Sequence, residues 1–454
     1  MSSSVYNPLE QSLLTFHNYI PNFCNGKDTP RDYLERCLEK IDLLEPKVNA
    51  FVVMNIESAR SAADASSKRY RDGKPLSIVD GMPFGVKDLY ETIDMKTQMN
   101  SPVYEDWEGI RDSAHAFVLR KGGSVILGKT ATTEFGMASP PPTRNPFNYD
   151  KTAGGSSSGS SAAVGASMIP AASGSQVRGS IVRPAGYCAN FALKPTFGAI
   201  NRGGGHSLAP SQSVLGVHAG SLEDCWSTAF YISSQAGGDA GCPGLFGNPT
   251  IEKPIKPDKI IRIDSIGWDS TTDSTKEAFE GFLQKLITNG VEIISRKDDE
   301  RVEKFEEALY EIPDYLFRML AYESRWPLQD YNLSQPGTLS QKMLDSLELG
   351  LSVSVEDYRL ILKRRQKLRD LQKSVSEIAG SFLLLCSCDP PPDYPYIGDP
   401  VYGDVSSTLG APSFSLPFLE VEGLPVGVQY MGFPGDDYRI ASHSKWMIEV
   451  LKGK

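Results

Sequence analysis

The sequence lacks the features that mark nucleic-acid-binding and membrane proteins. Its 454 residues include 46 basic and 56 acidic side chains, a formal net charge of −10, and no block of basic residues. Binding to nucleic-acid phosphates requires a positive surface, so we expect no nucleic-acid partner. No run of 18 apolar residues occurs, and Met1 precedes neither the basic region nor the apolar core of a signal peptide. We therefore expect a cytoplasmic protein without a membrane partner.

Cysteine and histidine are also few, and their spacing suggests neither a disulfide framework nor a metal site. The seven cysteines show no repeated Cys-x-x-Cys spacing, so free thiols are expected. None of the five histidines lies in a His-Glu-x-x-His pattern or a Gly-x-Ser-x-Gly elbow. We expect no metal and no organic cofactor, and a Ser-His-Asp triad is the weaker alternative. Among the histidines, His206 is the one that we expect to approach a pocket.

The apolar content, by contrast, is that of an ordinary globular protein, with 40% hydrophobic and 22% charged residues. Helical and strand-like spacings alternate along the chain. This pattern predicts an α/β fold, one large domain over residues 1–454, with a twisted mixed sheet covered by helices on both faces. Its expected parts are an N-terminal helical region (1–75), a core (76–230), a helical excursion (300–380), and C-terminal strands and a helix that complete the core (390–454).

Local spacing predicts individual elements within this fold. Thr29, Pro30 and Asp32 form a helix start, and apolar residues follow at helical intervals. The Pro- and Tyr-rich stretch 390–396 is expected to be an irregular loop that lines a pocket. The other predicted elements are strands within 77–86 and at 123–128, 259–263, 291–294, 413–417 and 426–430, and helices at 274–286 and 440–451.

Residues 154–161 form a Gly/Ser tract, GGSSSGSS. Such a composition is most often a flexible linker. Here the tract leads into the small, apolar stretch 162–170, which can pack as a helix, and a linker would not lead into a buried element. Glycines and serines at a loop-to-helix junction present backbone N–H groups to an oxyanion. With Ser180 downstream and Lys87 upstream, the pattern is typical of a serine hydrolase that uses lysine as its base.

Residues 123–130 match the phosphate-loop pattern GxxxxGK[ST]. A phosphate loop follows a strand, whereas Val125, Ile126 and Leu127 are themselves strand-forming residues. We therefore expect Lys129 to be a structural or pocket-edge residue. A nucleotide-binding protein without enzymatic activity is an alternative that rests on this match alone.

Six motifs in order resemble those of the amidase signature family, and they extend over nearly the whole chain. They are GMPFGVKD at 81–88, GGSVILGKT at 122–130, TAGGSSSG at 152–159, GSIVRPA at 179–185, LKPT at 193–196 and GLPVGVQ at 423–429. The resemblance implies a large α/β domain, with residues 76–230 as the signature core, and a Ser-Ser-Lys catalytic unit. Carried over by motif, Ser180 is the nucleophile, Ser156 is the bridging serine in a cis peptide, and Lys87 is the base.

The chemistry of these residue types agrees with the roles that the resemblance implies. A serine hydroxyl is a weak nucleophile at neutral pH and needs a base. Lysine can be that base only where burial keeps its amine uncharged, and the apolar neighbours of Lys87 suit burial. The Ser156 hydroxyl can donate and accept at once, so it can relay a proton between Ser180 and Lys87. On the local pattern alone, a surface ammonium at Lys87 is an equal alternative.

The approach to the nucleophile departs from the usual family pattern, because GSQVRGS replaces GTDTGGS. In this region Gln176 and Arg183 resemble a branch that includes malonamidases, where the arginine before proline is associated with a substrate carboxylate. Guanidinium groups suit that task, so we predict that Arg183, Arg178 and Gln176 bind substrate. Structural or surface ion pairing is the alternative for both arginines. The predicted oxyanion hole consists of the backbone N–H groups of Val177, Arg178, Gly179 and Ser180.

These inferences favour an amidohydrolase that cleaves the C–N bond of a small organic amide through a serine acyl-enzyme. The substrate could carry a carboxylate or another polar carbonyl group. One alternative is the catalytic subunit of a glutamine-dependent amidotransferase, which would need a partner chain, and another is a carbamate or urea hydrolase of the same family. The expected partner is a small-molecule amide, and a homodimer is compatible with the sequence.

Overall fold

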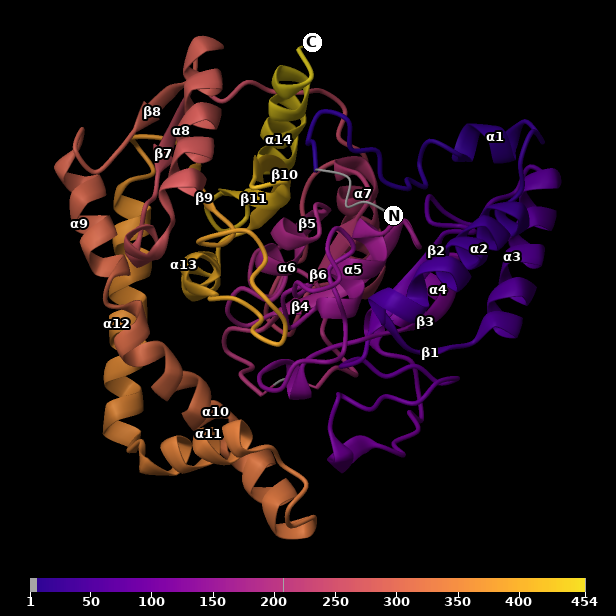
Figure 1. The fold of residues 1–454 in the computed structure, drawn as a ribbon, viewed down its shortest axis with the longest axis horizontal. Coiled ribbons are helices and arrows are strands. Elements are labelled where there is room, and N and C mark those ends of the chain that lie inside the picture. The colour runs from indigo at the N-terminus through magenta and orange to yellow at the C-terminus, as the bar shows by residue number, and fades with distance from the viewer. Residues whose placement is uncertain (1–5, 207, 454) are drawn as a thin grey trace.

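A mixed sheet of 11 strands runs through the computed structural model, which describes residues 6–206 and 208–453 (Figure 1). Strand β2 is parallel to both of its neighbours, β3 and β4, and β7 is parallel to β8 and β9, whereas the other pairs are antiparallel. In spatial order the strands are β1 (Phe51–Met54), β3 (Val125–Thr130), β2 (Pro83–Lys87), β4 (Ala171–Gln176), β6 (Val214–Ala219), β5 (Phe191–Lys194), β10 (Ser413–Val421), β11 (Leu424–Met431), β9 (Phe382–Leu385), β7 (Lys259–Arg262) and β8 (Glu292–Ile294).

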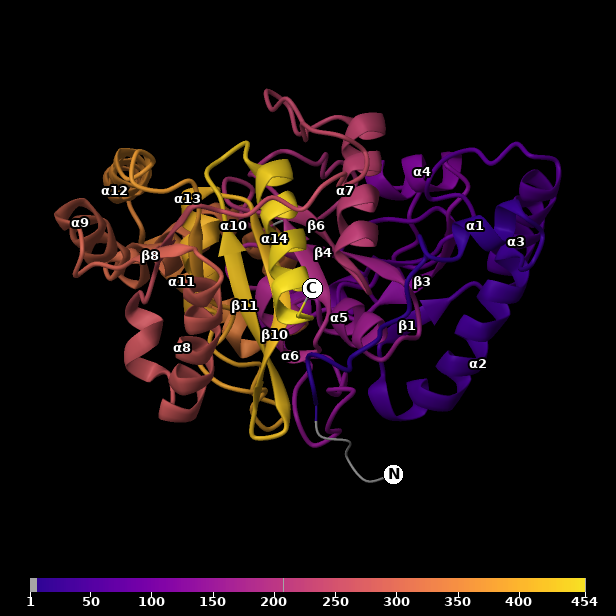
Figure 2. The ribbon, with the colours of Figure 1, turned by 90° about the horizontal axis from the view of Figure 1, so that it is seen from above.

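Helices cover both faces of this sheet (Figure 2), which confirms the predicted α/β class. Alternate residues of β3 show why: Val125 and Leu127 join one buried cluster, and Ile126 joins another. Successive strand residues point to opposite faces, so a strand that is apolar throughout must be covered twice. On one side lie α2 (Pro30–Val48), α3 (Ile56–Arg71) and α5 (Ser158–Gly165), with α6 (Val182–Tyr187) beside α5; on the other side α4 (Ala114–Lys121), α7 (Leu222–Ala236), α14 (Asp437–Leu451) and α8 (Asp273–Thr288) pack in succession.

The predicted helical excursion at 300–380 corresponds to four helices beside the sheet (Figure 1). They are α9 (Glu300–Leu309), α10 (Ile312–Ser334), α11 (Gln341–Ser352) and α12 (Val355–Ser374). The short elements are α1 (Ile20–Cys24), η1 (Pro102–Tyr104), η2 (Glu134–Gly136), η3 (Ile266–Ser270) and α13 (Val401–Leu409). Within residues 6–206 and 208–453, no helix is long and apolar enough to cross a membrane.

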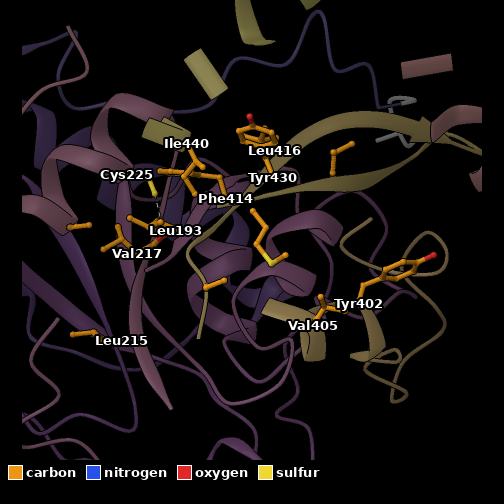
Figure 3. Close-up of a cluster of buried hydrophobic side chains, with 14 of the residues drawn as sticks. Leu193, Leu215, Val217, Cys225, Tyr402, Val405, Phe414, Leu416, Tyr430 and Ile440 are labelled. Atoms are coloured by element: carbon orange, nitrogen blue, oxygen red, sulfur yellow. Dashed lines mark hydrogen bonds between the residues drawn. The ribbon is translucent and has the colours of Figure 1, made fainter. Parts of the chain in front are cut away.

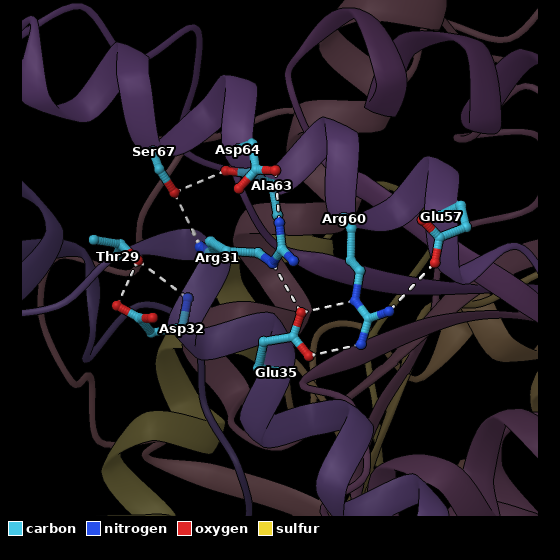
Figure 4. Close-up of polar contacts among 9 residues, drawn as sticks. All are labelled: Thr29, Arg31, Asp32, Glu35, Glu57, Arg60, Ala63, Asp64 and Ser67. Carbon is cyan, nitrogen blue, oxygen red and sulfur yellow. Dashed lines mark hydrogen bonds and ion pairs between the residues drawn. The ribbon is translucent and has the colours of Figure 1, made fainter.

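Helix α2 begins where its capping residues predict. The Thr29 side chain accepts a hydrogen bond from the backbone N–H of Asp32. Figure 4 shows how Glu35 then joins α2 to α3, since it accepts from both Arg31 and Arg60 at 2.8 and 2.9 Å. These charges are partly exposed, and such pairs contribute at most about 1 kcal/mol, so the buried apolar faces of the two helices supply most of the stability here.

The central part of the sheet is held by a cluster of apolar side chains from strands that are far apart in sequence (Figure 3). Leu193 and Val217 meet Phe414, Leu416 and Ile440 there, so the C-terminal strands complete a core begun by β5 and β6. All seven cysteines are free thiols, as predicted, and five of them are buried.

Most predicted elements are present within two or three residues, but three boundaries differ. The helix expected in the stretch 162–170 is α5, which begins at Ser158 inside the Gly/Ser tract and ends at Gly165. Strand β2 starts at Pro83, because residues 77–82 form turns in which Asp80 N–H donates to Ser77 and Met82 N–H donates to Val79. Strand β10 extends to Val421, since it forms a hairpin with β11 through Glu422 and the following glycine, both at positive φ (54° and 78°). Two such residues are what a tight hairpin turn requires.

Candidate active site

Lys87 is the last residue of β2, and its side chain is fully buried. Its Nζ lies 2.8 Å from the Oγ of Ser156, 3.0 Å from that of Ser157 and 2.8 Å from that of Ser175. Burial holds the pKa of this amine well below its usual value, because desolvation disfavours the charged form. No neighbouring charge contributes to that shift. The arrangement therefore favours a neutral amine whose lone pair can take a proton.

Lys129 on the adjacent strand β3 is a buried lysine of a different kind. Its Nζ lies 3.1 Å from Oδ1 of Asp88 and donates to Thr97 at 2.5 Å. Burial lowers the pKa of Lys129, and the charge of Asp88 opposes that shift. The Asp88 carboxylate also accepts from the backbone N–H groups of Gln98 and Met99. Because Lys129 lies within a strand and pairs with a carboxylate, it has a structural role, and residues 123–130 do not form a phosphate loop.

Ser156 lies in the loop before α5, and the Gly155–Ser156 peptide bond is cis, as the family resemblance implies. The Gly155 carbonyl accepts a hydrogen bond of 2.6 Å from Nη2 of Arg183. A Cβ built on Gly136 would lie 3.5 Å from the Ser156 Oγ. Ser156 therefore lies beside η2, and the Arg183 guanidinium holds the carbonyl of the residue before it.

Ser180 lies between β4 and α6 in a segment whose backbone is oriented by its carbonyl groups. All four carbonyls from 177 to 180 accept hydrogen bonds, whereas the four N–H groups donate none within the described part of the chain. Free N–H groups beside a nucleophile are what an oxyanion hole requires. The donors to the carbonyls are the Gln212 amide, the Ser407 hydroxyl, and the backbone N–H groups of Arg183 and Ser157, in that order.

Close packing against α13 fixes the same segment. A Cβ on Gly179 would lie 3.2 Å from Pro400, and a Cβ on Gly403 would lie only 2.3 Å from the Gly179 Cα. Real Cβ atoms do not approach to 2.3 Å, so Gly403 must be glycine while the backbones stay where they are, and a side chain on Gly179 would need Pro400 to shift by a few tenths of an ångström.

Gln176 is fully buried behind this segment, and it does not line the cavity beside Ser156 and Ser180 that is described below. Its Oε1 accepts from the N–H groups of Ile181 and Val182 at 2.8 and 3.1 Å, and its Nε2 donates to Ser407 at 2.9 Å. The amide thus holds the start of α6 and has no free face toward a substrate, which corrects the predicted contact between Gln176 and substrate.

The two arginines beside Ser180 differ in how their charge is balanced. Arg178 forms a two-pronged ion pair with the buried Asp404, with Nε 2.8 Å from Oδ1, and its guanidinium lies 4.2 Å from the ring centre of Phe317. Arg183 is 3% exposed and donates only to the carbonyls of Gly398 and Gly155. Burial lowers the pKa of Arg183, and no described carboxylate lies within ion-pair distance of it. At the predicted carboxylate site, the charge of Arg178 is therefore neutralised by Asp404, and the charge of Arg183 is not neutralised by any described carboxylate.

A cavity of about 360 Å³ lies beside the two serines and the two arginines. Ser156, Ser180, Arg178 and Arg183 lie on its inner side. Helices α10 and α11 form the outer wall with Phe317, Leu320, Lys342, Asp345, Ser346 and Leu349. None of residues 390–396 lines this cavity, contrary to the prediction, and the lining residues from this part of the chain are Ile397, Gly398 and Pro400.

His206 does not line this cavity, contrary to the prediction, because its Nε2 is 2.8 Å from the Tyr331 hydroxyl in an aromatic cluster. Sequence reasoning also missed Ser157 and Ser175 beside Lys87, and Asp404 beside Arg178. Ser157 could have been found, since it follows Ser156 in the Gly/Ser tract. Nothing in the sequence marks Asp404, which is 226 residues from its partner.

Comparison with known proteins shows the family of the chain. A family model described as Amidase matches residues 32–365. The chain belongs to the amidase family. The chain is 29% identical over 456 residues to a glutamyl-tRNA(Gln) amidotransferase subunit from Roseiflexus castenholzii, a match that covers 91% of this chain and 90% of the relative.

Solved structures share the fold of this chain over nearly its whole length. An amidase structure has a TM-score of 0.84 at 24% identity and covers 96% of this chain and 99% of its own. A bacterial aryl acylamidase of the amidase signature family has a TM-score of 0.85 at 18% identity, with 98% and 99% covered. Amidases act on C–N bonds, and the assignment to a malonamidase-like branch stays a prediction.

Proposed function

We propose that this amidase is an amidohydrolase that cleaves a small organic amide through an acyl-enzyme on Ser180. The observation that carries the proposal is the buried Lys87 amine, 2.8 Å from the Ser156 hydroxyl and surrounded by hydroxyl groups in place of carboxylates. A lysine in an ion pair would hold its proton, whereas a desolvated amine among hydroxyls can accept one.

In the first half-reaction, Ser156 passes its proton to Lys87 Nζ while it takes the proton of Ser180. The Ser180 Oγ attacks the amide carbon, and the carbonyl oxygen becomes an oxyanion bound by the free N–H groups of 177–180. When the tetrahedral intermediate collapses, the C–N bond breaks. The leaving nitrogen takes a proton from Ser156, which recovers one from Lys87, and ammonia or an amine departs.

In the second half-reaction, water takes the place of the departed amine. Ser156 and Lys87 remove one of its protons as its oxygen attacks the ester carbon. The bond between that carbon and the Ser180 Oγ breaks, Ser180 regains its proton through Ser156, and a carboxylic acid leaves. No atom or electron from outside the amide and water is needed.

The charges in the pocket support a substrate with a carboxylate or another electron-rich carbonyl group. Asp404 neutralises Arg178, so Arg183 is the inner cation that an anion would balance. A guanidinium in a dry pocket gains most from such a partner. Phe317, Leu320 and Leu349 favour an apolar group on the rest of the substrate.

A panel of primary amides, anilides, carbamates and ureas tests the proposal, with ammonia or amine release measured for the wild type and for Ser180→Ala. We expect the wild type to release ammonia or amine from at least one amide, and Ser180→Ala to release none. Mass spectrometry of the quenched wild type should show the acyl group on the peptide that contains Ser180. A preference for carbamates or ureas would select that alternative reaction, and turnover by Ser180→Ala would exclude the mechanism.

A second candidate, the catalytic subunit of an amidotransferase, is supported by the similarity to the Roseiflexus castenholzii protein. Such a subunit would release ammonia from glutamine for transfer, and only with a partner chain would its activity be complete. Glutamine therefore belongs in the amide panel. Glutamine as the preferred amide, together with a stable complex with a second protein expressed from the same source, would favour this candidate over the hydrolase.

A further inference from the structure

The pocket wall beside Ser156 contains a residue in an unfavourable backbone conformation. Phe135 in η2 has φ 50° and ψ 20°, and Gly136 follows at φ 74°. A bulky residue in the left-handed region persists only where its surroundings hold it. Thr133, Gly136 and Met137 line the cavity together with Ser156. The Thr133 N–H donates to the Ser156 carbonyl at 3.3 Å, and a Cβ built on Gly136 would lie 3.5 Å from the Ser156 Oγ. The contacts that hold Phe135 in this conformation therefore also fix the position of residues 133–137 in the cavity wall.

An aromatic cluster holds the Phe135 ring. Tyr331 stacks on it, with ring centres 5.4 Å apart and an interplanar angle of 14°. Tyr104 meets it edge-on at 6.1 Å, and His206 lies at 5.2 Å. The Tyr331 hydroxyl is 2.9 Å from that of Tyr104 and 2.8 Å from Nε2 of His206. Tyr331 is thus the member that both stacks on Phe135 and ties the other two rings together.

Tyr331 belongs to α10, the helix that also supplies the opposite wall of the pocket. Leu320 lies 11 residues earlier on this helix, about 16 Å along its axis. Next to α11, the N–H of Ser340 donates to Glu134 in η2 at 3.2 Å. The two walls of the pocket are therefore connected outside it, through α10 and the aromatic cluster.

We propose that Tyr331 is a positioning residue for amide cleavage, an inference that rests on the proposed function. Its ring keeps Phe135 left-handed, and this conformation keeps Gly136 beside Ser156 in the wall of the cavity. Loss of the ring frees residues 133–137 to adopt a more favourable backbone, and the bridging serine loses this neighbour in the cavity wall.

The test compares Tyr331→Ala and Tyr331→Phe with a matched control, Tyr322→Ala. Tyr322 lies on the same helix and also stacks on an aromatic ring, that of Tyr358 at 4.1 Å and 14°, but it does not line the cavity. We expect Tyr331→Ala to lower kcat at least tenfold with less than a threefold change in KM. Tyr331→Phe keeps the stacked ring and should stay within threefold of the wild-type kcat, and Tyr322→Ala within twofold.

Hydrogen exchange provides a readout that needs no substrate. The N–H groups of Phe135, Gly136 and Met137 donate to Met99, Thr133 and Glu134. We expect these three amides to exchange at least tenfold faster in Tyr331→Ala and at the wild-type rate in Tyr322→Ala. If Tyr331→Ala does not fold, Tyr331→Leu removes the flat ring while keeping apolar bulk, and the same results are expected.

The two readouts separate the positioning role from the proposed function. Faster exchange in Tyr331→Ala would show that Tyr331 holds residues 133–137 in place. If the wild type cleaved no amide in the same experiments, the proposed function would be overturned and this structural role of Tyr331 would remain. Unchanged exchange and wild-type kcat in Tyr331→Ala, with an active wild type, would overturn the positioning role and leave the function intact. An equal loss of kcat in Tyr322→Ala would also overturn it.

Discussion

Lys87→Met gives the most direct test of the buried base, because it can be followed through stability as well as activity. In the folded protein, burial holds the pKa of Lys87 well below 10.5, whereas the unfolded chain has the ordinary lysine value. Between the folded pKa and about 10.5, the unfolded state binds one proton that the folded state does not. The free energy of unfolding therefore rises with pH in the wild type by about 1.4 kcal/mol per pH unit more than in the variant.

Urea unfolding, followed by the fluorescence of the five tryptophans, can measure this difference at about pH 8.5 and 10, inside the expected window. Between these two pH values, the free energy of unfolding of the wild type should rise by about 2 kcal/mol more than that of the variant. At neutral pH, Lys87→Met should be the more stable protein and should have lost at least ~10²-fold in activity. Lys40→Met, on the exposed side of α2, is the control and should keep the wild-type slope. Equal slopes for wild type and Lys87→Met would mean that the folded amine keeps its proton, and the lysine-base mechanism would then be wrong.

Further variants test the rest of the site. Ser180→Ala should abolish turnover and Ser156→Ala should reduce it by at least ~10²-fold, as loss of a proton relay does, in a single-turnover assay of amine release. Arg183→Ala should raise KM more for an acidic amide than for a neutral amide of the same size, by a factor that corresponds to about 2 kcal/mol of binding free energy. Arg178→Ala should raise KM for the two amides equally. Equal effects of Arg183→Ala on the two amides would refute a contact between Arg183 and the substrate. Gly403→Ala should lower kcat strongly, because its Cβ would displace the oxyanion segment; unchanged kcat would show that this segment moves freely.

The sequence could predict the chemistry near Ser180 because that chemistry depends on residue types in short segments. A lysine at the end of an apolar strand, two serines among glycines, and a capped helix at Thr29 each depend on neighbours within a few positions. Strand β3 could be recognised by its apolar residues, and this was enough to reject a phosphate loop at Lys129. The catalytic roles themselves stay predictions until the variants are measured.

Contacts between distant segments could not be predicted in this way. The pairing of Arg178 with Asp404, which leaves Arg183 as the cation without an anion, joins residues that no local pattern relates. The hold of Tyr331 on Phe135 likewise depends on where α10 packs.

The sequence by itself thus determined the α/β class, the family and the reactive residue types, since apolar periodicity and short motifs encode them locally. Only the tertiary structure decided which charges are neutralised, which N–H groups stay free and which helices wall the pocket. The reason is physical: burial, and with it the lowered pKa of Lys87, results from packing among residues that the chain brings together only when it folds.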